Sequence, residues 1–153
     1  MQKNDEKKAH IIYNKILKDI VVPIIGNKTT YMSDLQKAGK MMFGVKFKGV
    51  YPSDKIPKLN ELSSYAILNL DKSYEPGSHW IAIAKKGNRT YVYDSFGRTH
   101  TKIIPNLKYS GNGRLINTDR DAEQEIQQTD CGARSLAWLL LFHKWGVKYA
   151  KLI

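Results

Sequence analysis

The spacing of apolar residues predicts an amphipathic helix near the start of the chain. Over residues 5–20 the apolar side chains recur at helical intervals and lysines fill the other side, namely Ile12, Ile16, Leu17 and Ile20 against Lys7, Lys8, Lys15 and Lys18. Asp5 stands where an N-cap is expected, and Pro23 lies just beyond the expected end of the helix.

A second, shorter helix is predicted over 32–40, with Ser33 or Asp34 as its cap and Gly39 near its close. The following stretch, 43–57, alternates aromatic residues with Gly and Pro. Because such punctuation interrupts backbone regularity, this stretch is expected to be rich in loops, without a long regular element.

After residue 64 the periodicity becomes that of β-strands. Short β-rich runs bounded by turn residues predict three strands, at 65–70, 80–84 and 90–93. Residues 85–89 have the composition of a hairpin connection between the last two strands. The polar span 98–118 is expected to mix loop with a turn at 110–113 and a short strand at 115–116.

The last element is a helix over 133–145 that is apolar on nearly all sides and is followed by Gly146. A helix of this kind is expected to be central and buried. The chain has no repeat and no linker-like segment, so residues 1–153 are expected to form one α+β domain, a small mixed or antiparallel sheet packed on this helix.

Charge is the unusual feature of the composition, with 25 Lys and Arg against 14 Asp and Glu and a net charge of +11. Such an excess attracts polyanions, including nucleic acid, although it also serves as a solubilising surface. No apolar run approaches the about 18 residues of a membrane span, and residues 1–8 lack a signal-peptide core. We therefore expect no membrane partner and an intracellular, non-secreted protein.

Cys131 is the only cysteine, so it cannot form an internal disulfide. It directly precedes the apolar helix, and a thiolate is favoured at a helix N-terminus. His79 opens one predicted strand and Asp94 ends the next, 15 residues later. Because paired strands lie about 4.8 Å apart, a hairpin returns Asp94 to the neighbourhood of His79. A thiol, a base and an orienting carboxylate are the parts of a cysteine hydrolase.

Each residue also has an ordinary structural explanation. A lone cysteine is usually a small core hydrophobe, a histidine at a strand start is usually a surface residue, and an Asp before Ser-Phe-Gly is usually a turn former. Metal binding is not expected, because one Cys and scattered His lack the close ligand pairs of zinc sites.

An acyl-transfer site also needs donors for an oxyanion. The backbone N–H groups near Cys131 and Gly132 are candidates for one half of such a hole, and a side-chain amide would complete it. Glutamines precede the cysteine at positions 124, 127 and 128. Asp130 is expected to be the helix N-cap and not a catalytic acid.

Three ordered motifs resemble the maturation cysteine protease of adenoviruses and, more broadly, the SUMO-deconjugating proteases. They are Gly77-Ser-His-Trp-Ile-Ala-Ile83, Tyr93-Asp-Ser-Phe-Gly97 and Asp130-Cys-Gly132, and the resemblance covers about residues 64–145. It implies a papain-like cysteine protease core with Cys131 as the nucleophile. His79 would be the general base and acid, and Asp94 would orient it.

The resemblance also implies an oxyanion glutamine. The adenoviral spacing, seven residues before the cysteine, selects Gln124, whereas the SUMO-protease spacing, six residues before, falls on Glu125. Gln124 is therefore the first choice, and Gln128 is the fallback if the loop is shortened.

Substrate-binding residues follow from the same comparison. Trp80 would brace His79 and wall a narrow channel at the scissile bond, and Gly132 adjoins the nucleophile. The segment 47–54 is similar to the one before the histidine in adenovirus-like and virus-like transposon proteases, which adds Asp54 to the expected substrate-binding residues.

The expected function is therefore a viral or virus-like cysteine endopeptidase that processes capsid or core precursors in the virion and the host-cell interior, as a monomer. Two alternatives stay open: a ubiquitin-like or SUMO-type deconjugating protease, and a catalytically dead, basic nucleic-acid-binding scaffold. The adenoviral enzyme uses a disulfide-linked peptide cofactor, which a chain with one cysteine cannot bind in that way. No cofactor is required on this view, and stimulation by DNA stays open because of the charge.

Overall fold

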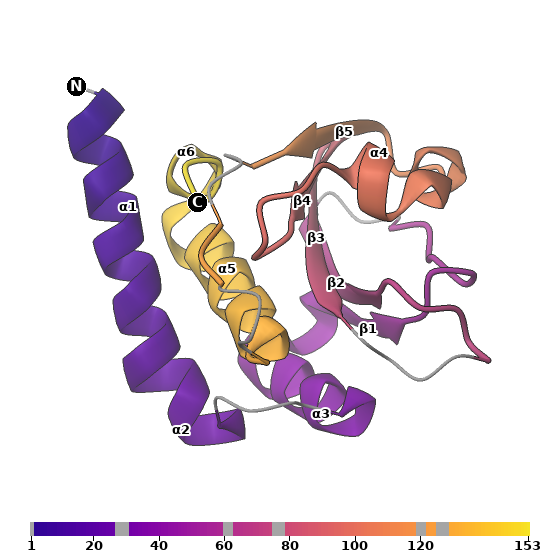
Figure 1. The fold of residues 1–153 in the computed structure, drawn as a ribbon, viewed down its shortest axis with the longest axis horizontal. Coiled ribbons are helices and arrows are strands. Elements are labelled where there is room, and N and C mark those ends of the chain that lie inside the picture. Colours follow the sequence, from indigo (N-terminus) through magenta and orange to yellow (C-terminus); the bar gives the residue numbers. More distant parts are fainter. Residues whose placement is uncertain (1, 27–30, 60–62, 75–78, 119–121, 125–128) are drawn as a thin grey trace.

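The computed structural model describes residues 2–26, 31–59, 63–74, 79–118, 122–124 and 129–153 (Figure 1). Its centre is a five-stranded sheet in the order β1-β2-β3-β4-β5. The strands are β1 (Phe47–Tyr51), β2 (Ser63–Asn69), β3 (Trp80–Lys86), β4 (Arg89–Tyr93) and β5 (Arg114–Asn117). The three central strands are antiparallel, whereas β1 and β5 each run parallel to their neighbours. The expected mixed α+β sheet is confirmed.

Helices cover both faces of this sheet (Figure 1). On one face α5 (Cys131–Trp145) lies between the sheet and α1 (Gln2–Ile16), next to α3 (Met32–Phe43). The other face packs against the short helices α4 (His100–Ile103) and η3 (Pro105–Tyr109). Successive β3 residues alternate between the two cores, with Ala82 in the α5 core and Ile81 and Ile83 in the other.

The helix α5 begins at Cys131, two residues before the predicted start, and ends at Gly146, whose φ is 84°. As far as Phe142 its apolar residues are buried on all sides, because α1 covers the side that faces away from the sheet, whereas Trp145 at its end is exposed. The prediction of a central, buried helix is therefore confirmed. The short helix α6 (Val147–Ala150) follows directly.

The first helical segment is longer than predicted. After α1 the chain continues through a π-helical turn, η1 (Leu17–Val21), into α2 (Val22–Ile25). Asp5 lies inside the first turn of α1 and does not precede the helix as a cap, and Pro23 lies within α2. Proline is tolerated in the first turn of a helix, and the wide π-turn before it starts a new hydrogen-bonding register.

The second helix also differs at its ends. Ser33 and Asp34 lie inside the first turn of α3, and Tyr31 holds the N-cap position without a side-chain cap bond. The helix closes at Gly44, whose φ is 60°, and is followed by the 3₁₀ turn η2 (Gly44–Lys46).

Gly39 is an interior residue of α3, and its role is close packing instead of helix termination. A Cβ at this position would lie 2.4 Å from the Phe47 ring. The absence of a side chain therefore allows α3 to approach β1 closely.

Strands β2, β3 and β4 and the hairpin between the last two confirm the predicted strands. The loop expected over 43–57 instead contains β1, and the polar span 98–118 contains α4 and η3 as well as the predicted short strand, which is β5. β1 is short and irregular, with a register shift between Phe47 and Val50 where Gly49 adopts a φ of 133°. This bulge explains why its sequence lacks strict alternation.

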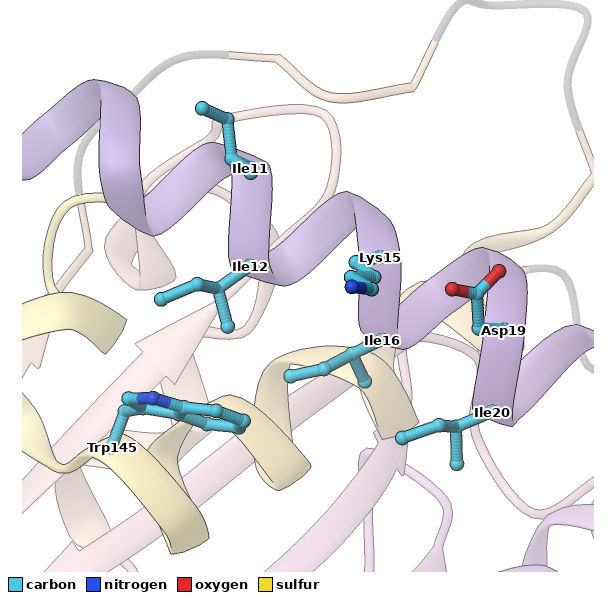
Figure 2. A pocket seen from close by; sticks show the side chains of 7 residues that line it. All are labelled: Ile11, Ile12, Lys15, Ile16, Asp19, Ile20 and Trp145. Carbon is cyan, nitrogen blue, oxygen red and sulfur yellow. The ribbon is translucent and has the colours of Figure 1, made fainter.

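A groove of about 570 Å³ lies on the outer side of the helical layer (Figure 2). It is lined by isoleucines of α1 and η1 and by Trp145 at the end of α5. Within the described part of the chain, no helix combines the length and apolar character needed to cross a bilayer.

Candidate active site

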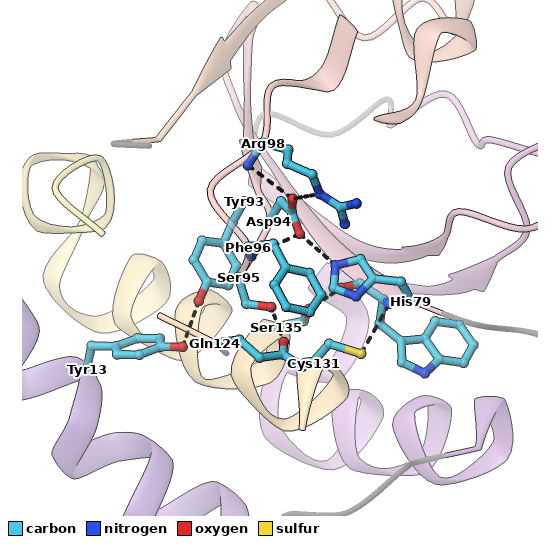
Figure 3. A network of polar contacts seen from close by, with 11 residues as sticks. Tyr13, His79, Tyr93, Asp94, Ser95, Phe96, Arg98, Gln124, Cys131 and Ser135 are labelled. Carbon is cyan, nitrogen blue, oxygen red and sulfur yellow. Dashed lines mark hydrogen bonds and ion pairs between the residues drawn. The ribbon is translucent and has the colours of Figure 1, made fainter. Parts of the chain in front are cut away.

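Three separate segments meet at one edge of the sheet: the start of β3, the end of β4 and the N-terminus of α5 (Figure 3). Antiparallel pairing of Ala82 with Tyr93 places Asp94 beside the residues that lead into β3. His79 Nε2 lies 2.6 Å from Asp94 Oδ1. The geometric prediction that the hairpin returns Asp94 to His79 is therefore confirmed.

Cys131 is the first residue of α5 and is 7% exposed. Its Sγ accepts a hydrogen bond from the backbone N–H of Trp80 at 3.4 Å, and the thiol lies close enough to His79 to help raise the pKa of the imidazole. Ser135, one turn along α5, donates from Oγ to the Trp80 carbonyl oxygen at 3.3 Å. These contacts join the N-terminal turn of α5 to the start of β3.

The Asp94 carboxylate is fully buried and receives donors on both oxygens. Oδ1 accepts from His79 and from the Phe96 N–H at 3.2 Å, and Oδ2 accepts from the Arg98 N–H at 3.1 Å and from Arg98 Nε at 2.8 Å. Burial alone would raise the pKa of Asp94, but the hydrogen bonds and charges of His79 and Arg98 outweigh it and lower the pKa from 3.8 to about 2. Asp94 is therefore a stable carboxylate.

His79 is held in a defined orientation and tautomer. Because the Asp94 carboxylate can only accept, Nε2 of His79 is the donor between them, so in the neutral imidazole Nδ1 is the nitrogen that can accept a proton. Burial would lower the pKa of His79, but its hydrogen bond to Asp94 and its interaction with Cys131 prevail and raise the pKa above 6.5. The Phe96 ring stacks on the imidazole, with centroids 4.8 Å apart and planes at 30°.

Gln124 is buried next to the turn that follows Asp94. Its Oε1 accepts a hydrogen bond from Ser95 Oγ at 2.5 Å, and its backbone N–H donates to the Ser95 carbonyl oxygen at 3.0 Å. In Figure 3 its side chain lies between Ser95 and Cys131. With the amide oxygen bonded to Ser95, the amide nitrogen is the donor end. The fallback residue, Gln128, lies outside the described residues.

The structure brings two of the three expected substrate-binding residues to this cluster. Trp80 adjoins His79 and contacts Cys131 through its backbone, and Gly132 is the buried second residue of α5. The Asp54 carboxylate makes its contacts elsewhere. It accepts hydrogen bonds from the Ser73 N–H at 2.8 Å and from Ser73 Oγ at 2.7 Å. The side-chain bond from Ser73 also holds the pKa of Asp54 below its ordinary value. Asp54 thus ties two exposed loops together.

Asp130 holds the N-cap position of α5, as predicted, but its side chain makes no cap bond. Its backbone, with φ of −96° and ψ of 24°, is not in the extended conformation of an N-cap that aims its side chain at the first-turn N–H groups. The carboxylate instead pairs with Arg134 at 3.0 Å. Asp130 therefore does not compete with a ligand for the N–H groups that follow Cys131.

Sequence reasoning missed three contributors, all in the turn after β4: Ser95, Phe96 and Arg98. The Gly97 N–H donates to the Asp94 carbonyl oxygen at 2.8 Å, and Gly97 adopts a φ of 72°, so the chain doubles back on Asp94. The available signal was the pentapeptide Asp-Ser-Phe-Gly-Arg itself, in which a tight turn returns the residue after glycine toward the aspartate.

The arrangement can support nucleophilic attack by sulfur, with a base that is oriented by a buried carboxylate. Among the residues that the structure describes, no three His, Cys, Asp or Glu side chains gather as metal ligands. Compared with known proteins, the chain matches no protein-family model and no curated protein.

Proposed function

We propose that this protein is a cysteine endopeptidase. The observation that carries the proposal is the 2.6 Å hydrogen bond between Asp94 and His79 Nε2, with the Cys131 thiol at the start of α5 close enough to His79 to help raise the pKa of the imidazole. A cysteine that is merely a small core residue has no need of an imidazole whose tautomer is set by a buried carboxylate.

In the proposed reaction His79 Nδ1 takes the proton of the Cys131 thiol, and Sγ attacks the carbonyl carbon of a peptide bond. The tetrahedral intermediate collapses to a thioester as the C–N bond breaks, and the imidazolium gives its proton to the departing amine. Water, deprotonated by His79, then attacks the thioester, so the products are a carboxylic acid and the free thiol. Asp94 stabilises the imidazolium at each stage.

The oxyanion of both intermediates needs hydrogen-bond donors near Sγ. Support for Gln124 in this role is its position between Ser95 and Cys131, with its amide oxygen bonded to Ser95 Oγ (Figure 3). The backbone N–H groups at the start of α5 would supply the rest, and Asp130 does not occupy them.

The proposed substrates are precursors of viral or virus-like structural proteins, which the resemblance of the three motifs favours, and the proposed sites of action are the virion and the host-cell interior. A ubiquitin-like conjugate is the alternative substrate. A panel of peptides with Gly-Gly or Gly-Xaa-Gly sites, run beside a ubiquitin-like electrophilic probe, separates the two.

The net charge of +11 favours one additional property, binding to nucleic acid. Its observable is the slope of log affinity for duplex DNA against log salt concentration, which is steeply negative when lysines and arginines displace counterions. A flat response would remove nucleic acid from the proposal.

The protease proposal is tested by the rate of thiol alkylation with iodoacetamide near neutral pH. Wild type is expected to react faster than a free thiol at the same pH, Cys131→Ala to lose all labelling, and His79→Ala to slow labelling by about 10²-fold, the lower end of what a positioned base contributes. His10→Ala, on α1, is the matched control and should label like wild type. An unchanged rate in His79→Ala would contradict the proposal.

A further inference from the structure

Arg98 supplies half of the donors that hold the Asp94 carboxylate. Its backbone N–H and its Nε both bond Oδ2, at 3.1 and 2.8 Å, while Oδ1 is left to His79 and the Phe96 N–H. The Arg98 side chain is 40% exposed, whereas that of Asp94 is fully buried. The arginine thus joins the buried carboxylate to the protein surface.

The same guanidinium also lies against the other support of the histidine. Its Cζ is 5.1 Å from the centroid of the Phe96 ring, and that ring also stacks on the His79 imidazole, with centroids 4.8 Å apart. The Phe96 ring therefore contacts both Arg98 and His79, beside the hydrogen bond between Asp94 and His79 (Figure 3).

We infer that Arg98 is a positioning residue of the proposed active site: it fixes the plane of the Asp94 carboxylate so that Oδ1 faces His79, and it contacts the Phe96 ring that stacks on the imidazole. This inference rests on the proposed function. A carboxylate held on one oxygen only can rotate about its Cβ–Cγ bond, and rotation would exchange the oxygen that faces Nε2 or break the bond. Two donors from Arg98 on Oδ2, its backbone N–H and its Nε, oppose that rotation, and a side-chain substitution removes the Nε donor alone.

The charge and the shape of Arg98 have separable effects. Its charge favours the ionised form of Asp94, so removal of the charge should make the carboxylate easier to protonate. Its planar guanidinium bonds Oδ2 and covers an aromatic ring at once, which the compact ammonium of lysine does not reproduce. Arg98→Met should therefore lose both effects, whereas Arg98→Lys should keep the first and lose part of the second.

The experiment measures Cys131 alkylation against pH in wild type, Arg98→Met, Arg98→Lys and Arg89→Met. Arg89 is an exposed arginine at the far end of the same β3–β4 hairpin and serves as the matched control. In Arg98→Met we expect a rate about tenfold lower at neutral pH and an acid limb moved to higher pH by about one unit. Arg98→Lys should keep the wild-type acid limb and recover part of the rate, and Arg89→Met should match wild type.

A second readout needs no reaction: the ¹³C NMR titration of the Asp94 carboxyl carbon, whose midpoint should rise in Arg98→Met only. An Arg98→Met protein with wild-type rate and an unmoved carboxyl midpoint would overturn the inference, as would a lower melting temperature alone with both pH readouts unchanged. If wild-type Cys131 shows no His79-dependent reactivity, the proposed function fails, and the carboxyl titration still decides whether Arg98 controls Asp94.

Discussion

Removal of one hydroxyl should measurably loosen the attachment of α1 to the sheet. Tyr13 in α1 and Tyr93 at the end of β4 share a buried hydrogen bond of 2.7 Å between their phenol oxygens. Burial raises the pKa of both phenols above the ordinary value of 10, so both remain protonated at any ordinary pH and the bond persists. Tyr93 directly precedes Asp94, so this bond anchors the strand that carries the carboxylate.

Tyr13→Phe deletes the oxygen and leaves the rings in place, where they meet edge to face with centroids 6.1 Å apart. The Tyr93 hydroxyl is then buried without this partner, and such a loss costs about 1–3 kcal/mol of unfolding free energy. The stacking of Tyr93 on Trp138, at 5.4 Å, is preserved, so the cost should not include a cavity term of the size seen for Tyr→Ala.

The assay is urea unfolding followed by circular dichroism, in which the midpoint should fall while the slope stays constant. Each kcal/mol lost should also lower the melting temperature by about 2–4 °C for a domain of this size. Tyr109→Phe, which removes the hydroxyl of a side chain that is 79% exposed, is the control and should leave the midpoint unchanged.

A double-mutant cycle isolates the bond itself. The double variant Tyr13→Phe, Tyr93→Phe removes both hydroxyls, so no hydroxyl is left buried without its partner. Its loss of unfolding free energy should therefore be smaller than the sum of the losses in the single variants, with a coupling of about 1 kcal/mol. Strict additivity, or a Tyr13→Phe protein as stable as Tyr109→Phe, would refute the reasoning.

Three further outcomes are expected. The pKa of Asp94 falls from 3.8 to about 2 on folding, so the carboxylate stabilises the fold above pH 3.8 by about 2 kcal/mol and loses this contribution as pH falls through 2. Asp94→Asn should flatten that part of a curve of unfolding free energy against pH. An equally steep curve in the variant would contradict the assignment. The pKa of His79 is raised above 6.5, so its contribution is complete below pH 6.5 and is lost as pH rises through the raised value; His79→Gln should remove this alkaline-side loss in the same titration. Gly39→Ala would place a methyl group 2.4 Å from the Phe47 ring and should cost about 1–3 kcal/mol in urea unfolding, whereas Gly87→Ala, with open space around its Cβ but a φ of 62°, should show only the backbone penalty of about 1–2 kcal/mol.

The elements that were predicted well are those whose pattern is local. Strands β2, β3 and β4 follow from short β-rich runs, and α5 follows from an apolar stretch closed by Gly146, because side-chain periodicity and turn residues report directly on backbone conformation. β1 was missed for the opposite reason, since its pairing with β2 is parallel and its bulge at Gly49 hides the alternation. The prediction that Pro23 lies beyond the end of the helix was wrong for a similar reason, because the π-turn that accommodates the proline leaves no clear local signal in the sequence.

The residues of the candidate site also differ in how far the sequence predicted them. His79, Asp94 and Cys131 were identified from their order and from hairpin geometry, and their approach needs only strand pairing and the docking of α5. Asp54 was placed with them on resemblance, whereas the fold ties its carboxylate to Ser73. Arg98 was not singled out: the Asp-Ser-Phe-Gly-Arg turn indicates that residue 98 returns toward the aspartate, but only the fold shows that its guanidinium bonds Oδ2.

By itself, then, the sequence determined the helices and strands with local periodicity, the single cysteine and the candidate order of histidine, carboxylate and cysteine. Only the tertiary structure decided which nitrogen of His79 meets Asp94, that Gln124 is buried and bonded to Ser95 next to Asp94, and that Arg98 and Phe96 contact the pair. The physical reason is that periodicity is a property of neighbouring residues, whereas burial, hydrogen-bond partners and the pKa values that depend on them arise from segments that meet only in the folded chain.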